Sequence, residues 1–282
     1  MKFFADRVTK TSIPIHVVTK RKLKAWLGKQ SKSTKAWLKS VEFSADRGEV
    51  ILVPGSGGSV ALVVAGAGKN LDTWSLSPLP GKLPKGRYTL ANELDAEAAT
   101  LAALGWGLGC YRYSEYKSKP RHPSAQLVWP KHCDRAEARR LIAAVTLGRD
   151  LVNKPAADLG PAQIASRVRS LAKTHNAKVR IISGQQLQKG FPSIYTVGKA
   201  AAKDRQPRLC DLTWGRPKDP KITLVGKGVV FDSGGLDIKS AAGMRLMKKD
   251  MGGAASVLAL AHLIMDAKLR VRLRVLVPTV EN

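Results

Sequence analysis

The 282-residue chain lacks the cysteine pattern of a disulfide framework or of a thiolate zinc site. Its three cysteines, Cys110, Cys133 and Cys210, are far apart and form no CxxC pair, so we expect free thiols in or near cores. No apolar run reaches the roughly 18 to 20 residues of a membrane span, and the first residues lack the apolar core of a secretory signal. These absences argue against disulfide-rich secreted and membrane-spanning proteins and predict a cytoplasmic location.

Two common kinds of site motif are also missing. The five histidines show no HExxH or other metal-ligand spacing. The Gly-rich turn at residues 55–58 fits neither GxxxxGK[ST] nor a GxGxxG that opens a helix. We therefore interpret it as a turn between two neighbouring strands, VILVP and VALVVAG, rather than as a phosphate loop.

Acidic residues are scarce, with 21 Asp and Glu against 48 Lys and Arg, which gives a formal charge of +27. Such a surface attracts nucleic acid, anionic membranes or acidic partners through a salt-dependent field. No zinc-finger spacing or basic-aromatic pattern accompanies the charge, so a solvated basic surface is favoured and nucleic-acid binding stays an alternative. The lysine-rich residues 22–37 predict an amphipathic helix packed on the first domain, with a membrane-surface helix or a targeting presequence as alternatives.

Strands rich in Val, Ile and Leu alternate with helical segments, which predicts an α/β fold. We expect a small N-terminal α/β domain, then part of a second α/β domain whose central mixed sheet is flanked by helices. A polar, Pro-containing stretch at residues 113–130 separates them, so the predicted domains are 1–125 and 126–282. The predicted helices are 92–104, 135–151, 161–175 and 251–266, and the predicted strands are 178–183, 193–197, 209–214, 222–225 and 271–278.

Two aspartates follow elements at which α/β proteins bind ligands. Asp232, in FDSGG, comes after the strand at 222–225, and Asp250 stands before MGGAA at the mouth of a helix. Two carboxylates without histidine or thiolate suit Mn²⁺, Mg²⁺ or Zn²⁺. Taken singly, each is as readily a turn residue or a helix N-cap. Their combination with Lys227 and Lys239 favours a metal site.

The segments GKGVVFDSGG, LDIKSAAGM and MKKDMGGAA resemble, in order and spacing, the signature segments of the leucyl aminopeptidase (cytosol aminopeptidase) family of two-metal metallopeptidases. RDLVNKPAADLGP is similar to the segment that opens that family's catalytic domain. The resemblance is specific over residues 149–282 and weak before them. It implies a metalloaminopeptidase that releases N-terminal, leucine-like amino acids from peptides, and a homo-oligomer, a hexamer in the family.

The resemblance also implies a role for each matched residue. Lys227, Asp232 and Asp250 correspond to metal ligands for two divalent ions, Mn²⁺ or Zn²⁺ with Mg²⁺ as a further option, and Asp232 bridges them. Lys239 corresponds to the catalytic lysine that polarises the scissile carbonyl. Met247, together with Lys239 and Asp250, corresponds to the substrate-binding residues, and Met247 lines the pocket for the first side chain.

Elementary chemistry agrees with opposite roles for the two lysines. Lys227 can bind metal only as a neutral amine, and a nearby divalent cation lowers the pKa of its ammonium group enough for this. Lys239, outside the metal's ligand shell, can stay charged and stabilise the developing oxyanion. The metal ions lower the pKa of a shared water toward about 7.

The chain also departs from the family pattern. Val230 stands where a threonine is common, Asp237 precedes the lysine segment, and Arg245 stands where the family often has an acid. After VPTVEN at residues 277–282, family members continue into NTDAEGR, which supplies the remaining metal carboxylates and an arginine that holds bicarbonate. No similar carboxylate pair is found in these 282 residues.

We therefore expect an N-terminal domain plus the first half of a catalytic domain, with a partial metal site, weak metal binding and doubtful peptidase activity as it stands. The alternative is a non-catalytic aminopeptidase-like scaffold whose basic surface binds nucleic acid or an acidic partner. Steep salt dependence of binding to DNA or RNA favours that alternative.

Overall fold

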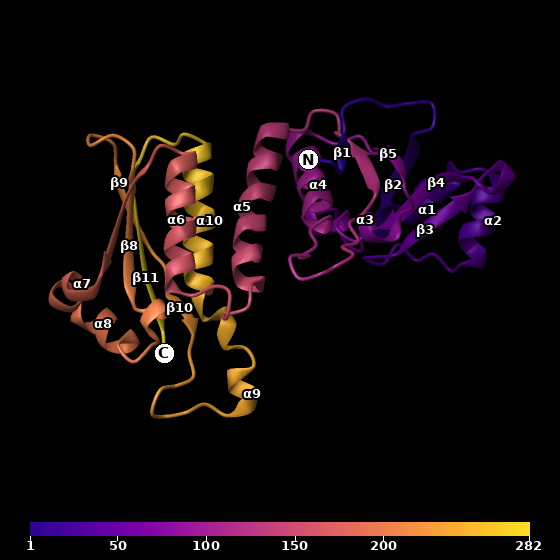
Figure 1. Cartoon of the computed structure of the whole chain (residues 1–282). Helices are drawn as coiled ribbons and strands as arrows, with labels where there is room; N and C mark the ends of the chain where they lie inside the picture. Colours follow the sequence, from indigo (N-terminus) through magenta and orange to yellow (C-terminus); the bar gives the residue numbers. More distant parts are fainter. The chain divides into compact units, whose positions relative to one another are not determined.

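The computed structural model describes all residues, 1–282, as two compact units, Met1–Ile142 and Ala143–Asn282 (Figure 1). The division lies within helix α5 (Arg135–Asn153), further along the chain than the predicted boundary at residue 125. The reason is β6 (Ala125–Val128), which pairs with β1 and β5 and so belongs to the first sheet.

The first unit contains a six-stranded sheet in the order β1-β6-β5-β2-β4-β3. Its strands besides β6 are β1 (Phe4–Ala5), β2 (Ile13–Val18), β3 (Val50–Pro54), β4 (Val60–Gly66) and β5 (Gly86–Leu90). All neighbouring strands are parallel except β3 and β4, which form an antiparallel pair. The predicted strand pair around the Gly-rich turn is therefore confirmed. Gly57 and Gly58 have φ values of 63° and 76°, which glycine adopts at little cost.

The helices of the first unit are α1 (Lys20–Gly28), α2 (Lys32–Ser40), α3 (Leu79–Lys82) and α4 (Ala96–Gly109), with 3-10 turns η1 (Ser56–Gly58) and η2 (Thr73–Ser75). The single helix predicted over residues 22–37 is wrong, because the chain forms two. Ser31 caps α2 by accepting a hydrogen bond from the Thr34 amide at 3.1 Å, which restarts the helix after Gly28. Asp95 caps α4 in the same way.

The second unit has a mixed sheet in the order β10-β11-β8-β7, with β9 also paired to β11. The strands are β7 (Lys178–Ser183), β8 (Arg208–Trp214), β9 (Lys221–Val225), β10 (Gly228–Phe231) and β11 (Arg272–Glu281). β11 is antiparallel to β8 but parallel to β9 and β10, which confirms the expected mixed sheet. β9 and β10 follow one another along the same edge of β11, and only residues 226 and 227 separate them.

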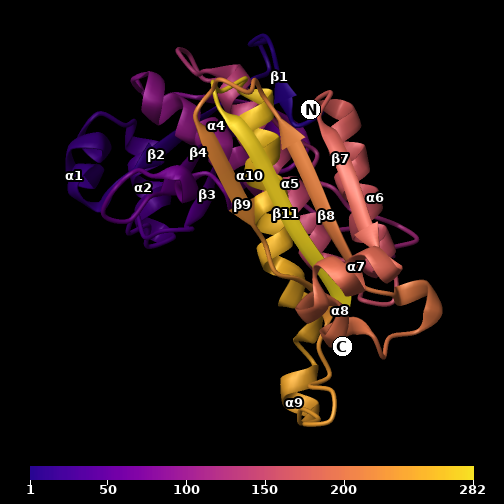
Figure 2. The same ribbon diagram turned by 90° about the vertical axis from the view of Figure 1, so that its left-hand side faces the viewer.

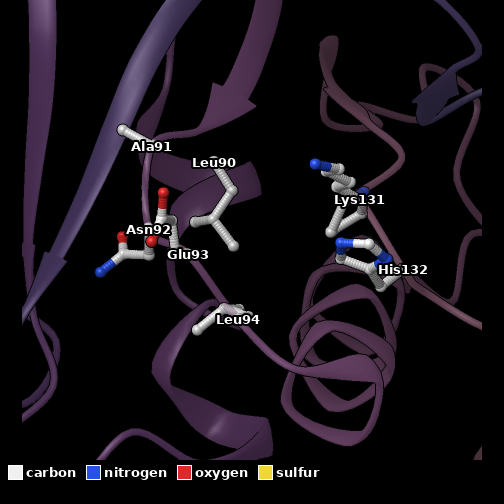
Figure 3. Close-up of a pocket in the computed structure, with 8 residues that line it drawn as sticks. Leu90, Ala91, Asn92, Glu93, Leu94, Lys131 and His132 are labelled. Atoms are coloured by element: carbon white, nitrogen blue, oxygen red, sulfur yellow. The ribbon is translucent and has the colours of Figure 1, made fainter.

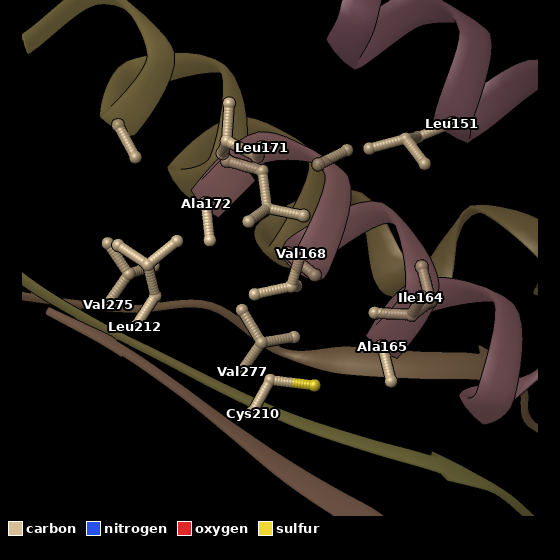
Figure 4. Close-up of a cluster of buried hydrophobic side chains, with 14 of the residues drawn as sticks. Leu151, Ile164, Ala165, Val168, Leu171, Ala172, Cys210, Leu212, Val275 and Val277 are labelled. Atoms are coloured by element: carbon tan, nitrogen blue, oxygen red, sulfur yellow. The ribbon is translucent and has the colours of Figure 1, made fainter. Parts of the chain in front are cut away.

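The remaining elements of the second unit are α6 (Pro161–Thr174), α7 (Gly184–Gly190), α8 (Pro192–Gly198), α9 (Ala241–Met244) and α10 (Gly252–Asp266), with 3-10 helices η3 (Lys203–Arg205) and η4 (Met247–Met251). α6 and α10 lie side by side on one face of the sheet (Figures 1 and 2). The core between them and the sheet contains Ile164, Val168, Leu212, Val275 and Leu258, several of which are seen in Figure 4.

The strand predicted at residues 193–197 is wrong, because this segment is helix α8. Pro192 occupies the first helical turn, where its missing amide is not needed. Ile194 and Tyr195 pack against Leu187 and its neighbours in a small satellite core. A short apolar run cannot distinguish helix from strand by periodicity alone.

The state of the three cysteines and the length of the helices are both described by the structure. Cys110, Cys133 and Cys210 are all free, and burial raises the pKa of the Cys110 and Cys210 thiols to about 12. No helix combines enough length with enough apolar character to cross a membrane.

Candidate metal centre

Glycines bring Lys227 against the start of α10. A Cβ at Gly226 would lie 2.6 Å from the Gly253 carbonyl oxygen and 2.5 Å from a methyl of Val257. No larger residue fits such a backbone contact without a shift. The amide of Ala254 donates to the Lys227 carbonyl at 2.8 Å and fixes the crossing. The side chain of Lys227 is thereby held beside the segment that carries Asp250.

Asp250 lies in η4, just before α10, and its carboxylate faces two ammonium groups. Its Oδ2 is 3.4 Å from Nζ of Lys227, and its Oδ1 is 3.3 Å from Nζ of Lys249. The side chain of Asp250 is only 11% exposed. Met251, not Asp250, is the N-cap of α10 and no side-chain cap bond is formed there, so the helix-cap interpretation of Asp250 is wrong.

Asp232 directly follows β10 and makes a second cluster. Its Oδ2 is 2.7 Å from Nζ of Lys239, while its Oδ1 accepts hydrogen bonds from the Gly234 amide and from Nδ2 of Asn282, both at 3.1 Å. The Lys239 hydrogen bond is the main cause that holds the pKa of Asp232 below its usual value, against the opposing effect of burial. Asp232 is thus an ionised acceptor that also supports a turn.

The loop after Asp232 folds back so that Lys239 can reach it. Gly234 has a φ of 95°, and a Cβ there would lie 2.1 Å from the Asp237 carbonyl oxygen. The amide of Lys239 donates to the Ser233 carbonyl at 2.9 Å, which closes the loop. Nζ of Lys239 then lies 3.0 Å from Sδ of Met247, so the predicted catalytic and pocket residues are in contact.

The predicted site residues form two clusters, one at each end of β10. Lys227 and Asp250 lie at its start, while Asp232, Lys239 and Met247 lie at its end. η4, which contains both Met247 and Asp250, packs beside β10 and connects the clusters. No group of three His, Cys, Asp or Glu side chains is close enough to hold a metal ion. The two carboxylates and the amine suit a hard divalent cation, but they are a partial ligand set.

The sequence interpretation missed two contacts of these carboxylates. Lys249 directly precedes Asp250 in the sequence, and this adjacency is the only sequence signal for their ion pair. Asn282 is far from Asp232 in the sequence, and it arrives because β10 and β11 are parallel neighbours: the amide of Asn282 donates to the Phe231 carbonyl at 3.0 Å. No local motif indicates this contact.

The structure shows the environments of the three residues, Val230, Asp237 and Arg245, that depart from the family pattern. Val230 is 1% exposed within the core of the second unit, where an apolar side chain packs without an unsatisfied hydroxyl. Asp237 and Arg245 are exposed. Nothing in the structure explains the choice of arginine at residue 245.

A separate cavity of about 380 Å³ lies in the first unit, between the segments that follow β5 and β6 (Figure 3). Glu93 is on one wall, and Lys131 and His132 are on the other. None of the predicted site residues lines this cavity. The candidate metal centre therefore depends on the second unit alone.

Comparisons with known sequences match both units. The M17 aminopeptidase N-terminal domain matches residues 13–130, and the cytosol aminopeptidase family catalytic domain matches residues 146–282. A probable cytosol aminopeptidase of Rhodococcus jostii is 36% identical over 244 residues, which are 79% of this chain and 48% of that protein. The relative from Leifsonia xyli is also 36% identical, over 85% of this chain and 51% of its own. The chain thus spans about half the length of these curated relatives.

Solved structures give the same assignment. The crystal structure of cytosol aminopeptidase from Coxiella burnetii is 42% identical, with a TM-score of 0.92 over 100% of this chain and 61% of that chain. The bottromycin maturation enzyme BotP in complex with Mn is 30% identical, with a TM-score of 0.80 over 96% of this chain and 60% of its own. These similarities extend the motif resemblance from residues 149–282 to the first unit. The chain belongs to the cytosol aminopeptidase family.

Proposed function

We propose that this chain provides part of the catalytic centre of a metal-dependent aminopeptidase that releases N-terminal, leucine-like amino acids from peptides. The observation that carries the proposal is the pairing of Asp232 and Asp250 with lysine amines at the two ends of β10. Family membership supports the peptidase class. The Mn complex of BotP supports a divalent metal in a similar fold.

In this proposal Lys227, Asp232 and Asp250 are ligands of two divalent metal ions. The ions are Mn²⁺ or Zn²⁺, with Mg²⁺ as a further option. When bound, the ions supply an activated water and offset negative charge that develops during the reaction. The carboxylates of Asp232 and Asp250 provide the anionic oxygen donors that such ions prefer. The side chain of Asp250 is largely buried, where interactions between charges are only weakly screened by water.

Lys239 and Met247 act on the substrate. The Lys239 ammonium, held by Asp232 through the 2.7 Å contact, donates to the scissile carbonyl oxygen as negative charge develops there. Met247, with its sulfur 3.0 Å from the same ammonium, lines the pocket for the first side chain. A flexible thioether accommodates apolar side chains of different shape.

The metal assignment is tested by titrating the chain with Mn²⁺ and following binding by electron paramagnetic resonance. We expect weak binding that Asp232→Asn and Asp250→Asn each abolish. The matched control is Asp237→Asn, which removes an exposed carboxylate from the same loop and should leave binding unchanged. Equal loss in all three variants, or no binding by the unmodified chain at millimolar Mn²⁺, would contradict the assignment.

Because the donors within the chain are only a partial set, we expect negligible hydrolysis of leucine amides by residues 1–282. Hydrolysis at an ordinary enzymatic rate with Mn²⁺, lost on Asp250→Ala, would show that the partial-site interpretation is wrong. We further propose a cytoplasmic location and a homo-oligomer, a hexamer by family resemblance. Light scattering during size-exclusion chromatography tests the assembly, and a monomer would count against it.

A further inference from the structure

Residues 20–40, which form helices α1 and α2 and the short link between them, are rich in basic residues and contain no acidic residue. Residues 1–142 contain 24 Lys and Arg and 11 Asp and Glu; residues 20–40 hold eight of the bases and none of the acids. The eight are Lys20, Arg21, Lys22, Lys24, Lys29, Lys32, Lys35 and Lys39, and all are exposed. We call them the α1–α2 basic surface. Within this unit α1 packs against β2 and α2 packs against β3 (Figure 1).

Most of this charge is not neutralised within the protein. Only Lys20 makes an ion pair, with Oδ1 of Asp46 at 2.5 Å. Lys35 donates to the Gly28 carbonyl at 3.0 Å, which ties the two helices together without offsetting charge. Like charges three or four residues apart on a helix repel by about 0.2–0.5 kcal/mol per pair. A polyanion bound along the helices would relieve this repulsion.

The apolar sides of both helices are already used. Leu38 is 2% exposed in a core with Val64 of β4, and Leu23, Trp26 and Leu27 pack against that core. An amphipathic helix that binds membranes must instead place its apolar face in the lipid. Among the large apolar side chains of the two helices only Trp37 is exposed, at 39%, and its Nε1 donates to the Leu52 carbonyl at 3.1 Å. One tethered tryptophan is not the apolar face that membrane binding requires, so the exposed cationic surface favours a phosphate backbone over a bilayer.

The spacing of the charges suits a linear array of phosphates. Lys32, Lys35 and Lys39 lie on one side of α2, and a rise of 1.5 Å per residue spreads them over about 10 Å along the axis. Nucleic-acid phosphates recur about every 3.4 Å along each strand. We propose that the α1–α2 basic surface docks the phosphate backbone of nucleic acid, without sequence preference. This surface belongs to the first unit, so the inference is independent of the metal centre.

The test is a fluorescence-anisotropy titration of the chain with a labelled duplex across about 50 to 200 mM salt. The test variant combines Arg21→Gln, Lys24→Gln, Lys32→Gln and Lys39→Gln. The matched control combines Lys69→Gln, Lys85→Gln, Lys117→Gln and Lys119→Gln, which removes the same charge from exposed positions of the same unit.

We expect the test variant to flatten the slope of log K against log salt by about 3 to 4, since each phosphate contact contributes about 0.9. Its affinity at the lowest salt should fall at least tenfold, while the control should change the slope by less than about 1. Equal losses in both variants would overturn the proposal in favour of a delocalised field. Absence of binding by the unmodified chain, or tighter binding to phosphatidylserine vesicles than to the duplex, would also overturn it.

A second measurement does not depend on how the variants fold. Lysine acetylation of the unmodified chain, read by mass spectrometry with and without duplex, should show protection of Lys24, Lys32 and Lys39 but not of Lys69 or Lys117. Protection of both sets to the same degree would contradict docking on α1 and α2.

Discussion

The contact between Gly226 and α10 gives a sharp test of how the candidate site is held. In Gly226→Ala the new Cβ would lie 2.6 Å from the Gly253 carbonyl oxygen and 2.5 Å from Val257 Cγ2. Ordinary contacts begin near 3.4 Å, so α10 and the 226–228 segment must separate by nearly 1 Å. Such overpacking costs about 1–3 kcal/mol. The hydrogen bond between the Ala254 amide and the Lys227 carbonyl, at 2.8 Å, is weakened as well, at about 1 kcal/mol.

The expected loss in unfolding free energy for Gly226→Ala is therefore about 2–4 kcal/mol. For a unit of this size it lowers Tm by about 6–15 °C. The control is Gly252→Ala in the first turn of α10, where a Cβ meets nothing within 4 Å. Because alanine is the better helix former, this control should gain about 0.5–1 kcal/mol.

Thermal unfolding measures both variants, and hydrogen exchange of the α10 amides locates the effect. Gly226→Ala should speed exchange at the start of α10 and, by moving Lys227 from Asp250, weaken Mn²⁺ binding. If Gly226→Ala were as stable as Gly252→Ala, the close backbone crossing would not exist as described.

Two further predictions concern the second unit. Leu258 is 1% exposed in the core, so Leu258→Ala should lower the unfolding free energy by about 2–5 kcal/mol. Leu260 is 42% exposed on the same helix, so Leu260→Ala should lower it by less than about 0.5 kcal/mol. Urea denaturation compares the two variants, and similar losses would contradict the core assignment. Burial is the main cause that lowers the pKa of His175 below 6.5. The charge interaction with His262, whose ring lies within hydrogen-bond distance, lowers this pKa further, while Asp266 raises it. The unfolded chain then binds the proton more readily, so stability present above about pH 6.5 should be lost as the pH falls toward the folded pKa. His175→Gln should flatten that profile, and an unchanged profile would exclude His175 as its source.

Local sequence determined most of the elements of the second unit. Pro161 at the start of α6 and the small residues of α10 are local signals, and the helices follow them closely. The α8 segment shows the limit, because Ile194 and Tyr195 suit either a strand or a helix until Leu187 packs against them. Residues 22–37 show another limit, since the break at Gly28 and the cap at Ser31 were not distinguished from a continuous helix.

The sequence by itself determined the family and the residue types of the candidate site, because the spacing of Lys227, Asp232, Lys239 and Asp250 is a local property of the chain. Only the tertiary structure decided which lysine pairs with which carboxylate. That choice depends on the crossing of Gly226 over α10 and on the return of the loop at Gly234, both of which are backbone contacts. It also depends on β11, which brings Asn282 to Asp232 from far along the chain. Pairing of distant strands is set by the packing of the whole sheet, and no local pattern encodes it.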